Sequence, residues 1–250
     1  MKLTKWRRGS FLERGVAYAT SLIGKKDVAR GTVALHLTRP DGFTFKAGQA
    51  VYLTLPGLKK ADGKGRVRTF SIASAPDDSD LVIATRLTDS ALKRGLASLP
   101  VGSAVEIEGP YGDMTLHDDA ARPAVFLAGG IGITPFRSMI RDAARDAPAR
   151  DLTLFYSNRS PEDAAFLSEL EQAARDNPGF RLVATMTEAA DWQGENGFIT
   201  REMIERHVGD LARPVFYLAG PPAMVVAMQA MLRQAGVGTK NIRAEEFAGY

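Results

Sequence analysis

The chain has 250 residues, which permits one large domain or two of ordinary size, and its hydrophobic content of 45% is normal for a globular protein. The absence of cysteine excludes disulfides and cysteine-held iron–sulfur clusters, and three histidines without metal-ligand spacing predict no metal site. The formal charge of +3 is uneven, because residues 1–115 carry 18 Lys and Arg against 11 Asp and Glu, whereas residues 116–250 carry 14 against 18.

Residues 1–14 form a basic N-terminal extension without the apolar stretch of a secretory signal, and we expect a frayed or tag-like segment there. No apolar run reaches about 18 residues, so no membrane span is predicted. The sequence also lacks a nucleic-acid-binding motif. These absences favour a cytoplasmic protein whose partners include neither nucleic acid nor membrane.

Short apolar segments recur between turns in residues 15–116, a pattern typical of a small antiparallel β-barrel. Val33, Leu35 and Leu37 alternate with smaller or polar neighbours, as in a half-buried strand. Helical pattern is nearly absent apart from residues 90–97. The segments expected to be strands are GTVALHLTR, AVYLTLPG, RTFSIAS, LVIATRLT and SAVEIEG.

From residue 117 to residue 250, apolar runs alternate with helical patterns, which predicts a parallel sheet covered by helices on both faces. In the first helix, the apolar residues at positions 136, 139, 140, 143 and 144 share one face. The next helix is expected to begin at Pro161. The predicted strands are AVFLAGG, LTLFYS, FRLVATMT, PVFYLAG and NIRAEEF.

The junction LAGGIGITPF follows the first of these strands and precedes a helix. Gly130 and Gly132 there would let the backbone approach a pyrophosphate closely, whereas the alternative is a tight turn without a ligand. Thr134 is expected to cap the helix and Pro135 to occupy its first position. Gly220 and Pro221 end the fourth strand of the parallel sheet, at its ligand side.

The second strand of the parallel sheet ends in Ser157, Asn158 and Arg159, beside the glycine-rich turn, where an adenosine ribose would lie. Arg159 predicts a contact with a 2′-phosphate, with Ser157 donating a hydroxyl, so the pattern leans towards NADPH over NADH. The alternative is a solvated loop that caps the following helix.

The segment RTFSIAS, residues 68–74, is compatible with a surface strand when taken alone. The ordered set R-x-F-S-I-A-S, G-P-Y-G, G-G-I-G-I-T-P, Y-S-N-R and A-G-P-P resembles the ferredoxin–NADP reductase family over residues 15–250, in its compact form without an iron–sulfur domain. The resemblance implies a six-stranded antiparallel flavin-binding barrel in residues 15–116. It also implies a Rossmann-like parallel α/β domain in residues 117–250 that binds NAD(P)H.

In the barrel, the resemblance implies that Arg68 pairs with the phosphates of FAD and that Ser71 directs its hydroxyl towards the flavin N5 edge. Phe70 stands where the family usually has Tyr and would pack along the flavin. Tyr111 either stacks on adenine or is a barrel-edge aromatic. The family's glycine in the second phosphate element, near Ser90, is missing here, which weakens the implied contact with the adenine end of FAD and leaves FMN as a less favoured alternative. The implied flavin contacts are Arg68, Thr69, Phe70, Ser71, Thr85, Leu87, Ser90 and Tyr111.

In the α/β domain, the resemblance implies contacts to NAD(P)H, with Ala219 replacing a cysteine of the family. The C-terminal Tyr250 would cover the flavin face that the nicotinamide reaches, with Glu246 near the site; the alternative is a frayed tail. Ser71, Glu246 and Tyr250 are therefore the candidate catalytic residues. The implied nucleotide contacts are Gly130, Gly132, Thr134, Ser157, Asn158, Arg159, Gly220, Pro221, Phe247 and Tyr250.

The resemblance implies an NAD(P)H-dependent reductase that passes hydride to FAD and electrons onward to a separate acceptor. The basic first half favours an acidic electron-transfer protein such as ferredoxin or flavodoxin as that acceptor. Three alternatives remain: reduction of ferric chelates or free flavin, service as the reductase component of an oxygenase, and a non-catalytic nucleotide-binding subunit.

Overall fold

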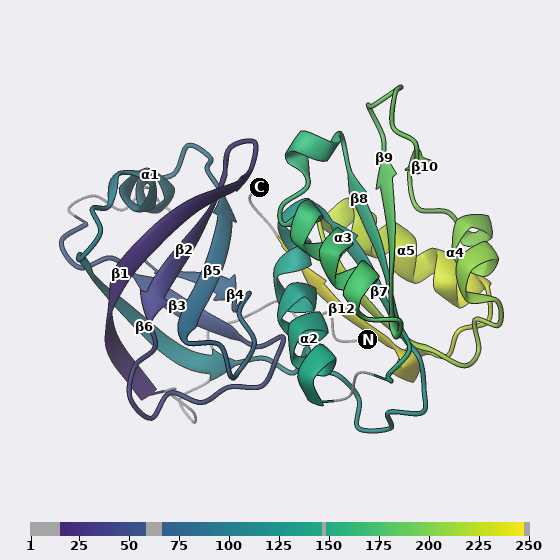
Figure 1. Ribbon diagram of the computed structural model, residues 1–250, viewed down its shortest axis with the longest axis horizontal. Helices are drawn as coiled ribbons and strands as arrows, with labels where there is room; N and C mark the ends of the chain where they lie inside the picture. The colour runs from purple at the N-terminus through teal and green to yellow at the C-terminus, as the bar shows by residue number, and fades with distance from the viewer. Residues whose placement is uncertain (1–15, 59–66, 147–148, 248–250) are drawn as a thin grey trace.

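The computed structural model describes residues 16–58, 67–146 and 149–247, which form two six-stranded sheets lying side by side (Figure 1). One sheet is antiparallel and the other is parallel with helices on its faces, so the predicted fold class is confirmed. None of the described helices is both long and apolar enough to cross a bilayer. The basic extension 1–14 lies outside the described residues, and the predicted domain boundary falls in the connection 112–123 between the sheets.

The antiparallel sheet has the strand order β4-β3-β6-β1-β2-β5, and the pairing of Ile72 with Ile83 joins its two edges into a barrel. Its interior is an apolar cluster that includes Leu35, Val51 and Ile107. The strands are β1 Val16–Ala29, β2 Thr32–Thr38, β3 Ala50–Thr54, β4 Val67–Ser71, β5 Asp80–Arg86 and β6 Ala104–Tyr111, with helix α1 Ala91–Ser98 after β5.

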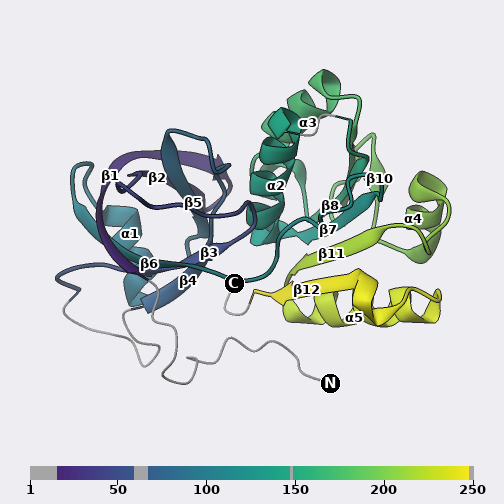
Figure 2. The same ribbon diagram turned by 90° about the horizontal axis from the view of Figure 1, so that it is seen from below.

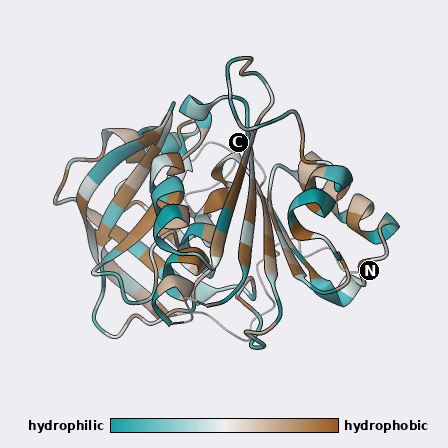
Figure 3. Cartoon of the chain, turned by 45° about the vertical axis from the view of Figure 1, so that its right-hand side comes forward, coloured by the Kyte–Doolittle hydropathy of each residue, from teal (hydrophilic) through white to brown (hydrophobic). Residues whose placement is uncertain are grey.

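The parallel sheet has the order β10-β9-β8-β7-β11-β12. Successive residues of a strand point to opposite faces of this sheet. In β7, Phe126 packs under one pair of helices, and Val125 and Leu127 pack under the other pair. Figure 3 shows hydrophobic residues along these strands. The strands are β7 Ala124–Gly129, β8 Leu152–Asn158, β9 Phe180–Met186, β10 Glu195–Asn196, β11 Val215–Gly220 and β12 Ile242–Glu246.

Two helices cover each face of the parallel sheet, and α2 also faces the barrel in both ribbon views (Figures 1 and 2). The helices are α2 Ile133–Asp146 and α3 Leu167–Asp176 on one face, and α4 Arg201–Val208 and α5 Pro222–Gln234 on the other. Short 3₁₀ turns lie at η1 Gly130–Gly132, η2 Pro161–Asp163 and η3 Thr239–Asn241.

Three expectations about local structure are corrected. The chain at Pro161 makes only the turn η2, and α3 begins at Leu167 because Phe166 adopts a left-handed conformation with φ of 62°. Thr134 lies inside α2, and its hydroxyl donates to the Ile131 carbonyl rather than capping the helix. The apolar face of α2 ends at Ala143, since Ala144 is exposed.

Candidate functional site

A cavity of about 670 Å³ lies at the carboxyl ends of β7, β8 and β11. In an open parallel sheet this edge is the ordinary place for a ligand, because the strand order reverses there. Most of the predicted nucleotide contacts are brought together in its wall. These are Gly130, Ser157, Asn158, Arg159, Gly220, Pro221 and Phe247.

Two glycines of the turn η1 are required, one by close packing behind the cavity and one by its backbone conformation at the cavity wall. A Cβ atom on Gly132 would lie 2.2 Å from the Ala219 carbonyl oxygen, so no side chain fits there. Gly130 has a φ of 53°, and a Cβ atom on it would meet no atom within 4 Å. Gly130 therefore presents bare backbone to the cavity, as close approach of a pyrophosphate requires, whereas Gly132 packs against β11 and does not line the cavity.

The end of β8 supplies polar groups to the same cavity. Asn158 is 7% exposed and is one of the residues that line the cavity. Ser157 is half-buried and Arg159 is exposed. Beneath them, the Tyr156 hydroxyl lies 3.2 Å from the Gly130 carbonyl oxygen and 3.1 Å from that of Ala165, and its single O–H can donate to either. Burial raises the pKa of Tyr156.

The predicted flavin strand is β4, which pairs with β3 through Leu53↔Arg68 and Ala50↔Ser71. Phe70 is 3% exposed and belongs to the barrel core. Because side chains alternate along a strand, Thr69 and Ser71 lie on its opposite face. The burial of Phe70 accounts for an aromatic residue at this position without a flavin, so its contact with the cofactor stays a prediction.

The sequence profile of the oxidoreductase NAD-binding domain matches residues 126–230, which include η1, the end of β8 and the β11–α5 turn. Ferredoxin–NADP reductase B of Sorangium cellulosum is 34% identical over 230 residues, which are 85% of this chain and 90% of that protein. The chain belongs to the ferredoxin–NADP reductase family. FAD and NAD(P)H are the cofactors of this family.

Other members of the family are similar over comparable lengths. The phenol 2-monooxygenase reductase component DmpP of Pseudomonas sp. strain CF600 is 33% identical over 227 residues. The match covers 88% of this chain but 63% of that protein. The crystal structure of the Amycolatopsis cytochrome P450 reductase GcoB superimposes with a TM-score of 0.82 at 28% identity, covering 93% of this chain and 71% of that one.

The remaining flavin residues predicted from the family lie on the barrel, outside the nucleotide cavity. Thr85 is fully buried near the end of β5 and Leu87 is exposed beyond it. The Ser90 hydroxyl caps α1 by accepting a hydrogen bond from the Lys93 N–H at 3.3 Å. The contact of this helix end with a flavin phosphate stays a prediction.

Tyr111 ends β6, where the family motif G-P-Y-G lies. Its ring centroid is 4.7 Å from that of Tyr52, and its hydroxyl donates to the Glu108 carboxylate. Both contacts fit a barrel-edge aromatic residue. Adenine stacking by Tyr111 stays a prediction.

The C-terminal strand brings one predicted residue of the family's tail into the cavity. The Phe247 N–H donates to the Gly220 carbonyl at 2.9 Å, which places the Phe247 side chain in the cavity wall. Glu246 is exposed at the end of β12. Tyr250 lies outside the described residues.

Phe198 and Arg86 are among the cavity residues that were not predicted from the sequence. Phe198 follows β10 and is 76% exposed at the wall, although so large an apolar side chain is usually buried. Arg86 reaches the cavity from β5 of the barrel. The sequence offered one signal for Phe198, a large apolar residue directly after a glycine. It offered none for Arg86, which reaches the cavity only because the two sheets pack together.

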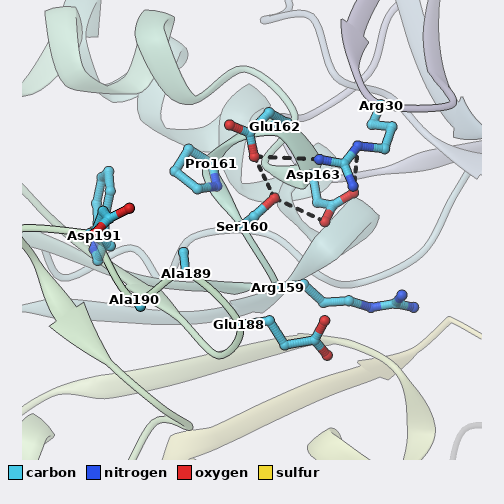
Figure 4. Close-up of a pocket in the computed structure, with 11 residues that line it drawn as sticks. Arg30, Arg159, Ser160, Pro161, Glu162, Asp163, Glu188, Ala189, Ala190 and Asp191 are labelled. Atoms are coloured by element: carbon cyan, nitrogen blue, oxygen red, sulfur yellow. Dashed lines mark hydrogen bonds and ion pairs between the residues drawn. The ribbon is translucent and has the colours of Figure 1, made fainter.

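A second cavity of about 560 Å³ adjoins the first, and Arg159 lines both. Arg30, from the β1–β2 turn of the barrel, pairs there with Glu162 at 3.4 Å and Asp163 at 3.9 Å. Figure 4 shows Arg159 pointing away from this cluster. The Arg159 side chain is thus not held by those two carboxylates.

Proposed function

We propose that this chain oxidises NAD(P)H, holds FAD in its barrel and passes the electrons singly to a separate protein acceptor. The observation that carries the proposal is the glycine-walled cavity at the ends of β7, β8 and β11, in a family that uses FAD and NAD(P)H. The names of the two relatives, a ferredoxin–NADP reductase and the reductase component of an oxygenase, agree with this activity.

The chain's own residues divide the work of binding. FAD, when bound, supplies the redox chemistry, because it accepts a hydride from a nicotinamide and releases electrons singly. Arg68 would hold the flavin phosphates with its fork of donors, and Ser71 would orient the reactive edge of the flavin. The bare backbone of Gly130 and Gly132 would hold the pyrophosphate of NAD(P)H. Phe247 would exclude water from the same cavity.

Phe198 would complete the nucleotide site as a platform for adenine. Its exposed ring lies in the cavity wall together with Met224 and Met228 of α5. Aromatic rings bind flat bases by offset stacking with an apolar surface behind them. Phe198→Ala would raise the Kd for NAD(P)H, whereas Phe198→Tyr would keep it.

The acceptor would be an acidic electron-transfer protein that docks on the barrel. The chain has no cysteine to hold a cluster of its own, and the barrel half of the sequence is the basic half. A dedicated oxygenase is the second candidate, favoured by the relative that is itself such a component, although the chain spans 63% of its length. Electrostatic docking predicts that acceptor reduction slows several-fold as salt rises.

Anaerobic titration tests the proposal. Protein reconstituted with FAD would show absorbance near ~450 nm that bleaches on addition of NADPH or NADH. Reduced protein mixed with ferredoxin, flavodoxin, ferric citrate or free flavin would then identify the acceptor class. Protein that stays colourless after incubation with FAD would exclude the reductase activity and favour a non-catalytic subunit. Equal rates with every acceptor at low and high salt would exclude the docked acidic partner.

A further inference from the structure

Helix α2 connects the two candidate binding elements directly. It begins at Ile133, immediately after η1, and its second turn contacts the segment 73–78 that follows β4. The Ser138 hydroxyl donates to the Ser74 carbonyl at 2.6 Å. The preceding residue of the helix, Arg137, donates from Nη1 to the Ala73 carbonyl, also at 2.6 Å. Two adjacent carbonyls of the barrel are thus held by two adjacent side chains of the α/β half.

Both donors are fixed in place. Ser138 is fully buried, and Arg137 is 9% exposed. Arg137 Nε and Nη2 also donate to Glu169 of α3, at 3.1 and 2.8 Å. The guanidinium carbon lies 4.5 Å from the centre of the Phe166 ring. A guanidinium held on several sides has little conformational freedom, so it fixes the position of α2 relative to the barrel carbonyl that it binds.

The carbonyls that they hold are equally fixed to the barrel. The Ala73 N–H donates to the Val82 carbonyl at 2.7 Å, and the Ile72 N–H donates to the Gln49 carbonyl at 2.9 Å. Only Ile72 separates Ala73 from Ser71. At the other end, the first turn of α2 is tied to η1 by Thr134, whose hydroxyl donates to the Ile131 carbonyl. A short, buried path therefore runs from the nucleotide turn to the flavin strand.

Farther along α2, a second contact with the barrel is more exposed than the hydrogen bonds of Arg137 and Ser138. Arg141 donates from Nε and Nη2 to the two Asp78 carboxylate oxygens at 3.0 and 2.9 Å, and Arg145 adds a third bond to Asp78 at 2.5 Å. These side chains are more exposed and lie farther along the segment from β4. They would stabilise the interface without bearing directly on the flavin strand.

We propose that Arg137 and Ser138 are positioning residues for hydride transfer, because they set the distance between η1, where NAD(P)H would bind, and β4, beside which the flavin would lie. In that step the C4–H bond of the nicotinamide breaks with its electron pair and an N5–H bond forms on the flavin, so the nucleotide is oxidised and the flavin reduced. The inference rests on the proposed function. Because reacting atoms must approach to about 3–3.5 Å, a shift of about 1 Å is enough to slow transfer about a hundredfold.

The test is anaerobic stopped-flow reduction of the FAD-loaded Ser138→Ala and Arg137→Lys variants by NADPH and NADH. We expect the limiting rate of flavin reduction to fall at least about tenfold, with flavin content and nucleotide Kd within about twofold of the wild type. The deuterium isotope effect with C4-deuterated nucleotide should stay expressed, because hydride transfer remains the slow step. Arg145→Ala is the matched control, expected to lower the melting temperature and leave the limiting rate unchanged.

Three results would overturn the positioning role. These are limiting rates within about twofold of the wild type in both variants, an equal slowing in Arg145→Ala, or a slowing that vanishes at saturating nucleotide. Wild-type protein that binds FAD but is not bleached by either nucleotide would instead contradict the proposed function. The two failures are therefore distinguishable in one data set.

Discussion

The two predicted phosphate-binding elements use different parts of the polypeptide. In the α/β half, η1 presents bare backbone, and Gly132 is packed so tightly on β11 that no side chain fits. In the barrel, the main predicted group is a side chain, the Arg68 guanidinium, to which the N-terminal end of α1, capped by Ser90, would add backbone N–H groups. A backbone site fails by steric exclusion, whereas a side-chain site fails by loss of charge. The two elements should therefore respond differently to substitution.

Gly132→Ala should have the largest effect. Its Cβ atom would lie 2.2 Å from the Ala219 carbonyl oxygen and 2.7 Å from the Gly220 nitrogen, and backbone atoms cannot yield as a flexible side chain does. We expect a destabilisation of at least about 3 kcal/mol and loss of NAD(P)H binding, read by thermal melting and by nucleotide titration. Gly238→Ala is the control, because its nearest neighbour is 4.0 Å away. An unchanged melting temperature in Gly132→Ala would contradict the steric account.

Arg68→Ala should come next and act on the other element. Loss of a charged hydrogen-bonding group costs about 1.5–3 kcal/mol, so the Kd for FAD should rise about tenfold to a hundredfold, measured by flavin fluorescence. The melting temperature of the protein without flavin should barely change. Arg94→Ala, an exposed arginine on α1, serves as the control. Equal FAD affinity in the wild type and Arg68→Ala would remove the guanidinium from the site.

Arg159→Leu should have a smaller and selective effect. If the guanidinium binds a 2′-phosphate, kcat/KM for NADPH should fall about tenfold while that for NADH stays within about twofold. Arg30→Leu is the matched control, because Arg30 lines the adjoining cavity but is paired with Glu162 and Asp163. A parallel fall for both nucleotides would show that Arg159 does not discriminate between them.

We expect the smallest effect in the pH dependence of stability, at the contact between Asp78 of the barrel half and helix α2. Burial raises the pKa of Asp78, but hydrogen bonds from Arg141, the Ala75 N–H and Arg145 outweigh it and lower the pKa to about 2. Since the folded pKa lies below the ordinary value of 3.8, the stabilisation is complete above that pH and is lost as pH falls towards 2. Thermal melting between pH 2 and pH 6 should show a steeper loss in the wild type than in Asp78→Asn. Parallel curves would contradict this linkage.

Strand periodicity and glycine placement were readable from the sequence because they depend on local geometry. Gly130, Gly220 and the polar end of β8 come together at the cavity because parallel strands end at one edge of the sheet, and Gly132 packs directly behind them on β11. Strand β1 had no clear pattern: it contains two register shifts, and only Thr20 and Leu22 are buried in it. The sixth barrel strand was expected from the family resemblance alone.

Contacts between the halves could not be predicted in the same way. Arg137 and Ser138 are polar residues on a helix, so the amphipathic pattern assigns them to solvent, yet they are buried against the barrel. Arg86 likewise reaches the nucleotide cavity from a strand of the other sheet. The cap assigned to Thr134 failed because the turn η1 leads directly into α2. For Arg137, Ser138 and Arg86, contacts between segments far apart in the sequence decided the outcome, and the local sequence pattern does not contain them.

The position of Phe247 in the cavity wall also bears on the order of events during synthesis. All six barrel strands lie within residues 16–111, so this half can fold while the remaining residues are still on the ribosome. The nucleotide cavity is complete only when β12 pairs with β11 and the Phe247 N–H reaches Gly220. A nascent chain would therefore complete the barrel, where we propose that FAD binds, before it completes the cavity proposed for NAD(P)H.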